Sequence, residues 1–209
     1  MSLKQLRVGP ISSSEGSYPV ASGSRDGCAV IQYGHAKFQE AVYRGNVFAV
    51  ADQAGAALAG GLSASPVNVC LFNPKGSNML AVIWWAGLVN MVDPGVAALT
   101  IWIGANINIT ADAVIGTAAV PRNCMIGNGK APSITTLTTA TLPAVPVAID
   151  VLGAFMAGAI TVDTQKAALG KWYDGSLVLY PGGALSFQAS AASGAAAAFG
   201  SWIWEEVLI

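Results

Sequence analysis

The chain has 209 residues, of which 54% are hydrophobic and only 10% are charged, and its formal net charge is −1. A chain of this length suits a single domain, and its nearly balanced charge gives no sign of a nucleic-acid or acidic-lipid partner. Ordinary soluble domains carry about 25% charged residues, so two interpretations compete: a membrane protein, or a subunit whose surface is largely covered by other protein.

The apolar segments do not fit a membrane protein. The longest apolar run, Met79–Val92, is shorter than the roughly 20 residues that a spanning helix needs. A membrane barrel stays open as the lesser alternative: it would need strands of about 10 residues that alternate between polar and apolar side chains, whereas the runs here are shorter and often apolar on both faces. Charge depletion is typical of interface cores. We therefore favour a subunit of a protein assembly and expect no membrane partner.

Residues 1–27 predict an extended N-terminal arm. The stretch is polar, rich in Ser and Gly, and interrupted by Pro10 and Pro19. A disordered terminus is one interpretation. The other, which we favour, is an arm that lies on a neighbouring subunit through backbone hydrogen bonds, with Arg7 and Arg25 among its contacts. The stretch lacks the apolar core of a signal peptide, which indicates synthesis in a reducing cytoplasm.

Residues 28–209 predict one β-sandwich domain. Short apolar runs, rich in β-branched and aromatic residues, are separated by Gly, Pro, Asn and Thr, and Gly45-Asn46 ends a short helical stretch. About eight to ten antiparallel strands fit an all-β, two-sheet, jelly-roll-like sandwich. The expected strands include residues 47–50, 67–72, 79–85, 99–103, 145–152, 176–180, 184–188 and 201–207.

Two turns in the predicted sandwich indicate β-hairpins. Residues 73–78 (NPKGSN) separate two apolar runs, and Pro181-Gly182-Gly183 separates two more. Pro and Gly supply the backbone angles that a tight reversal needs, and apolar runs on both sides of such a turn are typical of a hairpin. Between 111 and 143, several Pro, Gly and Asn residues and a Thr-rich segment predict a long loop excursion, which is functional or mobile.

Residue types that carry chemistry are scattered along the chain. Most Asp residues lie at predicted turns, where Asp is common because its side chain hydrogen-bonds to the nearby backbone. Glu205 and Glu206 are adjacent, so they must point to opposite faces of one strand. His35, the only histidine, stands apart from any catalytic pattern, and the three cysteines are widely separated. No nucleophile elbow, phosphate loop or zinc motif occurs. We expect no enzymatic activity, no metal and no cofactor.

Tryptophans supply the candidate interface residues. Trp202 and Trp204 share one face of the last predicted strand, whereas the adjacent Trp84 and Trp85 must point to opposite faces. We expect one member of that adjacent pair to lie in a subunit interface, where a buried Trp contributes about 2 kcal/mol or more. The candidate interface set is Arg7, Arg25, Trp84, Trp85, Trp202 and Trp204.

Four segments carry a resemblance to a known class of proteins: YRGNVFAVADQAG, LFNPKGSNMLAVI, WYDGSLVLYPGGALSFQAS and SWIWEEV, in this order. The pattern resembles structural proteins of tailed-bacteriophage virions, in particular head decoration (cement) proteins with jelly-roll domains. It spans residues 33–207 and covers neither the arm nor the Thr-rich excursion. The resemblance implies a non-enzymatic protein, made in a bacterial host, that forms a homo-dimer or homo-trimer. It also implies binding to the major capsid protein on the outer capsid surface, where the protein bridges capsomers.

A second function stays open, that of a tail-fibre or lectin-like jelly roll that binds carbohydrate or a receptor. Sugar sites usually combine an exposed aromatic platform with polar side chains on loops. Arg122, Asn123, Asn128 and the segment Trp172-Tyr173-Asp174 would supply such a set. A tail-tube or baseplate subunit fits the composition equally well.

Overall fold

The structure is a computed structural model that describes residues 38–65, 68–90, 98–107, 109, 114–156, 167–192 and 198–209. Both sheets belong to one compact unit, Ala41–Ile209. The predicted arm, with Arg7 and Arg25, lies outside the described residues.

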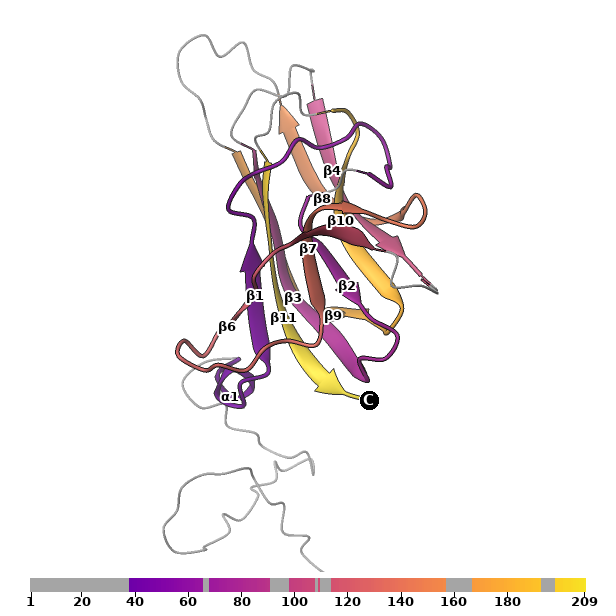
Figure 1. The fold of residues 1–209 in the computed structure, drawn as a ribbon. Helices are drawn as coiled ribbons and strands as arrows, with labels where there is room; N and C mark the ends of the chain where they lie inside the picture. The colour runs from indigo at the N-terminus through magenta and orange to yellow at the C-terminus, as the bar shows by residue number, and fades with distance from the viewer. Residues whose placement is uncertain are drawn as a thin grey trace, which may run out of the picture. The chain divides into compact units, whose positions relative to one another are not determined.

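Within these ranges nearly all regular structure is β-strand, and the one helix is short (Figure 1). The helix α1 spans Gln39–Tyr43. The strands are β1 (Val47–Ala51), β2 (Cys70–Asn73), β3 (Met79–Asn90), β4 (Ala98–Asn106), β5 (Ile115–Ala118), β6 (Arg122–Asn123), β7 (Thr135–Thr141), β8 (Val147–Met156), β9 (Ala167–Leu179), β10 (Gly183–Ala189) and β11 (Ala198–Leu208).

The strands form two antiparallel sheets that pack against each other (Figure 1). One has five strands in the order β6-β1-β11-β3-β9, and the other has six in the order β5-β7-β2-β10-β4-β8. The pairing is nested along the chain, because β1 pairs with β11, β2 with β10, β3 with β9 and β4 with β8. Nested antiparallel pairs divided between two sheets are the jelly-roll arrangement. The predicted all-β, jelly-roll-like sandwich is confirmed.

The two predicted hairpins are wrong, although their strands and turns are present. β2 and β3 lie in different sheets, and so do β9 and β10. Turn residues reverse the chain, but they do not decide whether the returning strand pairs beside its predecessor or packs across from it. Here the Asn73 side chain ties both crossovers together, since its Nδ2 donates to Met79 O at 2.8 Å and to Leu179 O at 3.0 Å.

The predicted excursion contains strands where it is described. β6 extends the five-stranded sheet beyond β1, while β7 and then β5 extend the six-stranded sheet beyond β2. A buried carboxylate anchors this insertion: Glu206 on β11 accepts hydrogen bonds from the backbone amides of Ser133, at 2.8 Å, and Ile134, at 3.0 Å. The segment therefore adds strands to one end of each sheet.

Aromatic side chains dominate the core between the sheets. Trp202 and Trp204 are fully buried and point to the same side of β11, as the alternation predicted. Trp202 stacks on Phe187 with ring centroids 4.6 Å apart, and Trp204 stacks on Phe48 at 5.9 Å. The Trp202 indole donates to Val69 O at 3.0 Å, so its one polar group is satisfied.

A second, smaller apolar cluster lies apart from the main core. It includes Cys70 and Phe72 of β2, Leu137 of β7 and Ala184 of β10, and Ala64 packs against it. The chain before β2 is held there by hydrogen bonds from Leu142 N to Ala64 O, at 2.7 Å, and from Ser63 N to Gln188 Oε1, at 2.8 Å. β10 is consequently buried along its whole length.

Candidate assembly interface

The outer face of the five-stranded sheet carries a line of side chains at one level across all five strands. In strand order these register partners are Arg122, Ala49, Ile203, Trp85 and Trp172. Side chains of directly opposed residues lie on the same face of an antiparallel sheet. We call these five residues the transverse row. Its apolar members include Trp172, which is 58% exposed, and the half-buried Trp85.

A β-bulge decides which of the two adjacent tryptophans reaches this face. The register on both sides of β3 shifts next to Trp84, between Ile83 and Trp85. The buried side chains of β3 are odd-numbered up to Ile83 and even-numbered from Trp84 onward. Gly87 is the exception, because the Trp85 indole covers it. A bulge re-aims side chains in this way. Trp84 is thereby 5% exposed, and Trp85 is left on the outer face.

Two glycines make room for the Trp85 indole. A Cβ at Gly87 would overlap the indole, and one at Gly170 would lie 2.9 Å from its Cζ2. Gly87 and Gly170 are themselves register partners on β3 and β9. The ring therefore lies against a patch of bare backbone, where its orientation is restricted by close contact.

Beside Trp85 the face is hollowed into an open groove of about 290 Å³. Ala49, Ser201 and Ile203 of β1 and β11 line it, together with Trp85 of β3 and, near β6, Val120 and Arg122. Since two strands separate β3 from β6, the flanking backbones stand about 14 Å apart.

The β6 end of this face is cationic. Arg122 and Lys130 are exposed, and the Lys130 ammonium donates to Asn46 Oδ1 at 2.6 Å. Glu205 of β11 is also on this face, two positions from Ile203. Burial raises the pKa of Glu205, and the positive charge of Arg44 opposes that rise only in part. Three basic side chains, those of Arg44, Arg122 and Lys130, accompany the acidic side chain of Glu205 at this margin.

The structure separates the predicted interface residues. Trp202 and Trp204 lie in the core, Trp84 is buried by the bulge, and Trp85 alone of the four predicted tryptophans reaches the outer face. The pairing of Trp85 with Trp172 across β3 and β9 could not be predicted from the residues around either tryptophan. The one pattern in the sequence that points to it is a glycine two residues from each tryptophan, on the same side of its strand.

The residues of the alternative sugar site are not brought together. Arg122 lies on β6 and Trp172 on β9, at opposite ends of the sheet and about 19 Å apart by strand spacing. Asn123 is buried and serves a turn, donating to Gly45 O at 2.7 Å and accepting from Met125 N at 2.8 Å. Tyr173 points away from Trp172, toward the other sheet.

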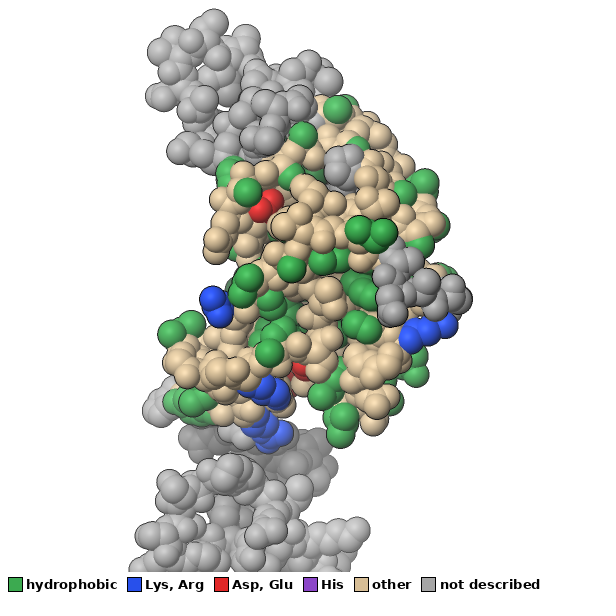
Figure 2. All heavy atoms as spheres, viewed as in Figure 1, with side chains coloured by type: hydrophobic (Ala, Val, Ile, Leu, Met, Phe, Trp, Pro, Cys, Tyr) green, Lys and Arg blue, Asp and Glu red, His purple; other side chains and the backbone are tan. Residues whose placement is uncertain are grey.

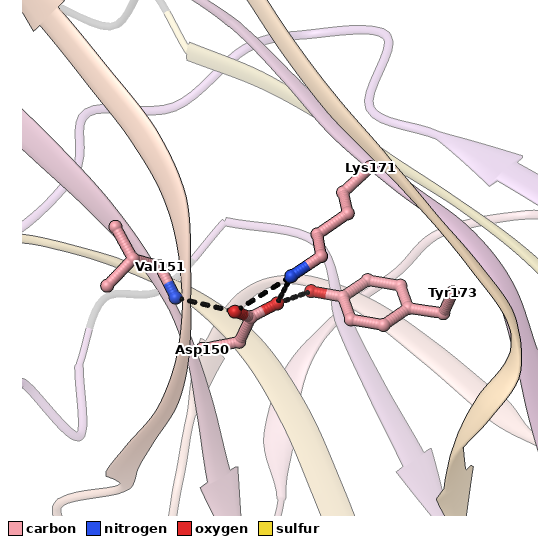
Figure 3. Close-up of polar contacts among 4 residues, drawn as sticks. All are labelled: Asp150, Val151, Lys171 and Tyr173. Carbon is pink, nitrogen blue, oxygen red and sulfur yellow. Dashed lines mark hydrogen bonds and ion pairs between the residues drawn. The ribbon is translucent and has the colours of Figure 1, made fainter.

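Tyr173 belongs to a polar cluster that links the two sheets at their β8 and β9 ends (Figure 3). Asp150 of β8 accepts from the Tyr173 hydroxyl at 2.6 Å and from the Lys171 ammonium at 2.8 Å. Burial raises the pKa of Asp150, but the hydrogen bonds from Lys171 and Tyr173 outweigh it, so the net shift is downward. The pKa of Tyr173 is raised by burial and by the adjacent carboxylate. The cluster acts as a cross-link.

The described part of the chain contains no group of three or more His, Cys, Asp or Glu side chains placed to hold a metal ion. None of its helices is long and apolar enough to cross a membrane. Cys70 and Cys124 are free thiols, and burial raises the pKa of Cys70 to about 12.

Comparisons of the chain with protein-family models, with curated proteins and with solved structures found no match. The jelly-roll assignment therefore comes from the strand order itself. The surface chemistry of the described residues is what bears on function.

Proposed function

We propose that the chain is a non-enzymatic structural subunit of a virion, a decoration protein on the head of a tailed bacteriophage, and that the transverse row is covered by other protein in the assembly. One observation supports this most: Trp85 and Trp172 lie side by side on an outward sheet face, next to a groove flanked by Arg122. Trp and Arg are enriched among the residues that dominate binding energy at protein interfaces.

The surroundings of the row support the same proposal. Val178, which is 45% exposed, and the half-buried Val82 continue the apolar surface on β9 and β3. Figure 2 shows one face of the chain, on which hydrophobic side chains are scattered singly and in small groups and charged side chains are few. Contiguous apolar patches on soluble proteins mark interaction sites. The phage head, the major capsid protein and further copies of the chain as partners come from the sequence resemblance.

Co-sedimentation with empty shells of the major capsid protein from the same virus tests the proposal. The wild-type chain should bind saturably. Trp172→Ala should weaken binding by about tenfold or more, because a Trp buried in an interface can contribute about 2 kcal/mol or more. Ile149→Ala is the matched control, since Ile149 is 47% exposed but lies on β8 of the other sheet, and it should bind like the wild type. A wild-type chain that ignores shells, or a Trp172→Ala variant that binds normally, would contradict the proposal.

A carbohydrate-binding jelly roll is the second candidate. The exposed ring of Trp172 favours it, because a sugar ring can stack on such a platform. Binding on a glycan array that Trp172→Ala abolishes, together with no binding to shells, would select this alternative.

A further inference from the structure

Each sheet has one short and one long edge strand, and the two long ones lie at the same side of the sandwich. β6 and β5 have two and four residues, whereas β9 and β8, at the other ends, have 13 and 10. Among the described strands, β8 pairs only with β4 and β9 only with β3. The outer edge of a long strand offers unpaired backbone groups to which another strand can bind, and short edge strands limit such pairing.

We propose that Asp150, Lys171 and Tyr173, which we call the edge cluster, prevent the long edges from pairing with strands of other copies of the chain. This role goes beyond the cross-link that the three side chains form within one molecule. It does not rest on the proposed function, because it concerns the edges of the sheets and not the transverse row.

The sequence of β8 makes an unprotected edge hazardous. Its side chains Val147, Ile149 and Val151 are 68%, 47% and 57% exposed. The strand contains no proline, and Asp150 is the only charged residue in residues 131–162. Apolar segments of high strand propensity, low charge and no proline associate readily, and single charged residues in or beside them oppose this. Asp150 is therefore the one charge that separates β8 from such a segment.

The charges of the edge cluster point inward from the two edges. Asp150 is the register partner of Ile103 on β4, and Lys171 that of Ala86 on β3, and both partners are fully buried. Since directly opposed residues share a face, the two charged side chains lie on the inner sides of their sheets. They meet at 2.8 Å, and the Tyr173 hydroxyl donates to the same carboxylate (Figure 3). A strand added at this edge would cover the ion pair and remove water from it, which is costly.

The backbone of β8 is irregular at the same place. Its register with β4 shifts twice, next to Trp102 and next to Gly104. Bulges bend and twist an edge strand, so that its donors and acceptors no longer match those of a regular strand. In addition, the Val151 amide donates to Asp150 Oδ1 at 2.9 Å. The carboxylate of the edge cluster thus also occupies one backbone donor of β8.

Removal of the carboxylate tests the edge cluster in the full-length chain, with aggregation followed by thioflavin T fluorescence and by the protein left in the supernatant. Asp150→Ala should aggregate about tenfold faster than the wild type or more. Asp150→Asn keeps an oxygen for Tyr173 but lacks the charge, so it should aggregate faster as well. The double variant Asp150→Ala/Ile149→Lys restores a charge at an exposed position of β8 and should return to within about threefold of the wild-type rate.

Two controls separate edge pairing from other causes of aggregation. Glu205→Ala removes an equal charge from β11, which is paired on both sides by β1 and β3, and should behave like the wild type. Tyr173→Phe removes one hydrogen bond but leaves the ion pair, so it should stay dispersed. Thermal unfolding checks that each variant is folded before incubation. Hydrogen exchange should show that amides of β8 become protected in the Asp150→Ala aggregates.

Contrary outcomes overturn the inference. Asp150→Asn that is folded and stays dispersed would do so, even if Asp150→Ala does not fold. Glu205→Ala that aggregates as fast as Asp150→Ala would show that lost charge alone is the cause. Failure of Ile149→Lys to slow aggregation, or aggregates in which β8 amides exchange as fast as in the dispersed wild type, would exclude the β8 edge as the site of association.

Discussion

Replacing Glu206 by alanine is expected to destabilise the sandwich and to release the insertion that flanks the groove. The Glu206 side chain is 3% exposed, and its carboxylate accepts from the Ser133 amide at 2.8 and 3.0 Å and from the Ile134 amide at 3.0 Å. Hydrogen bonds to a charged group contribute about 1.5–3 kcal/mol each, and a buried donor without a partner costs about 1–3 kcal/mol. Ser133 is exposed, so water replaces its partner, whereas Ile134 is buried. We expect a loss of about 2–4 kcal/mol in the free energy of unfolding.

Urea unfolding followed by tryptophan fluorescence measures this loss, with Glu205→Ala as the matched control. Glu205 is the neighbouring residue but lies on the outer face, and its replacement should change the free energy of unfolding by less than about 0.5 kcal/mol. Hydrogen exchange should show faster exchange at the Ser133 and Ile134 amides in Glu206→Ala alone. Equal stability of Glu206→Ala and wild type, or unchanged protection of those amides, would refute the anchoring role.

Three further predictions follow from particular contacts. Gly87→Ala should displace the Trp85 indole and weaken shell binding by about tenfold or more while the protein remains folded. Co-sedimentation measures the binding and thermal unfolding checks the fold. Unaltered binding would show that the space which Gly87 leaves for the indole is unimportant. Trp202→Ala should cost about 3–5 kcal/mol in urea unfolding, and a loss below about 1 kcal/mol would contradict its place in the core. The pKa of Tyr173 is raised above its ordinary value of 10.0, so the folded protein holds the hydroxyl proton more tightly than the unfolded chain does. The protonated hydroxyl therefore adds its full contribution to the free energy of unfolding below about pH 10, and this contribution is lost as the pH rises further. The wild type should therefore lose stability faster than Tyr173→Phe above pH 10, and equal slopes would count against the contact with Asp150.

The fold class could be predicted from the sequence because β-branched and aromatic residues favour strands wherever they occur in runs. Residues 47–50, 99–103 and 201–207 are runs rich in β-branched or aromatic residues, and each lies within an observed strand. Strand pairing could not be predicted in the same way. The contact of Asn73 with Leu179 joins residues 106 positions apart, and no local pattern reveals it. The turn residues correctly predicted where the chain reverses, but they did not predict which of the two sheets the following strand joins.

The candidate site was predicted only in part, for a similar reason. Alternation along a strand correctly separated Trp84 from Trp85 and placed Trp202 and Trp204 together. It could not say which side faces the core, because the bulge at Trp84 changes the alternation within β3. The outward pairing of Trp85 with Trp172 depends on register between strands far apart in sequence. Only the assembled sheet shows the row.

A reconstruction of the intact virion most directly tests the central claim that protein, and not solvent, covers the apolar outer face of the five-stranded sheet. It should show this chain on the outer surface of the head, with Trp85 and Trp172 packed against another polypeptide. A particle that lacks the chain, or one in which both tryptophans face solvent, would contradict the claim.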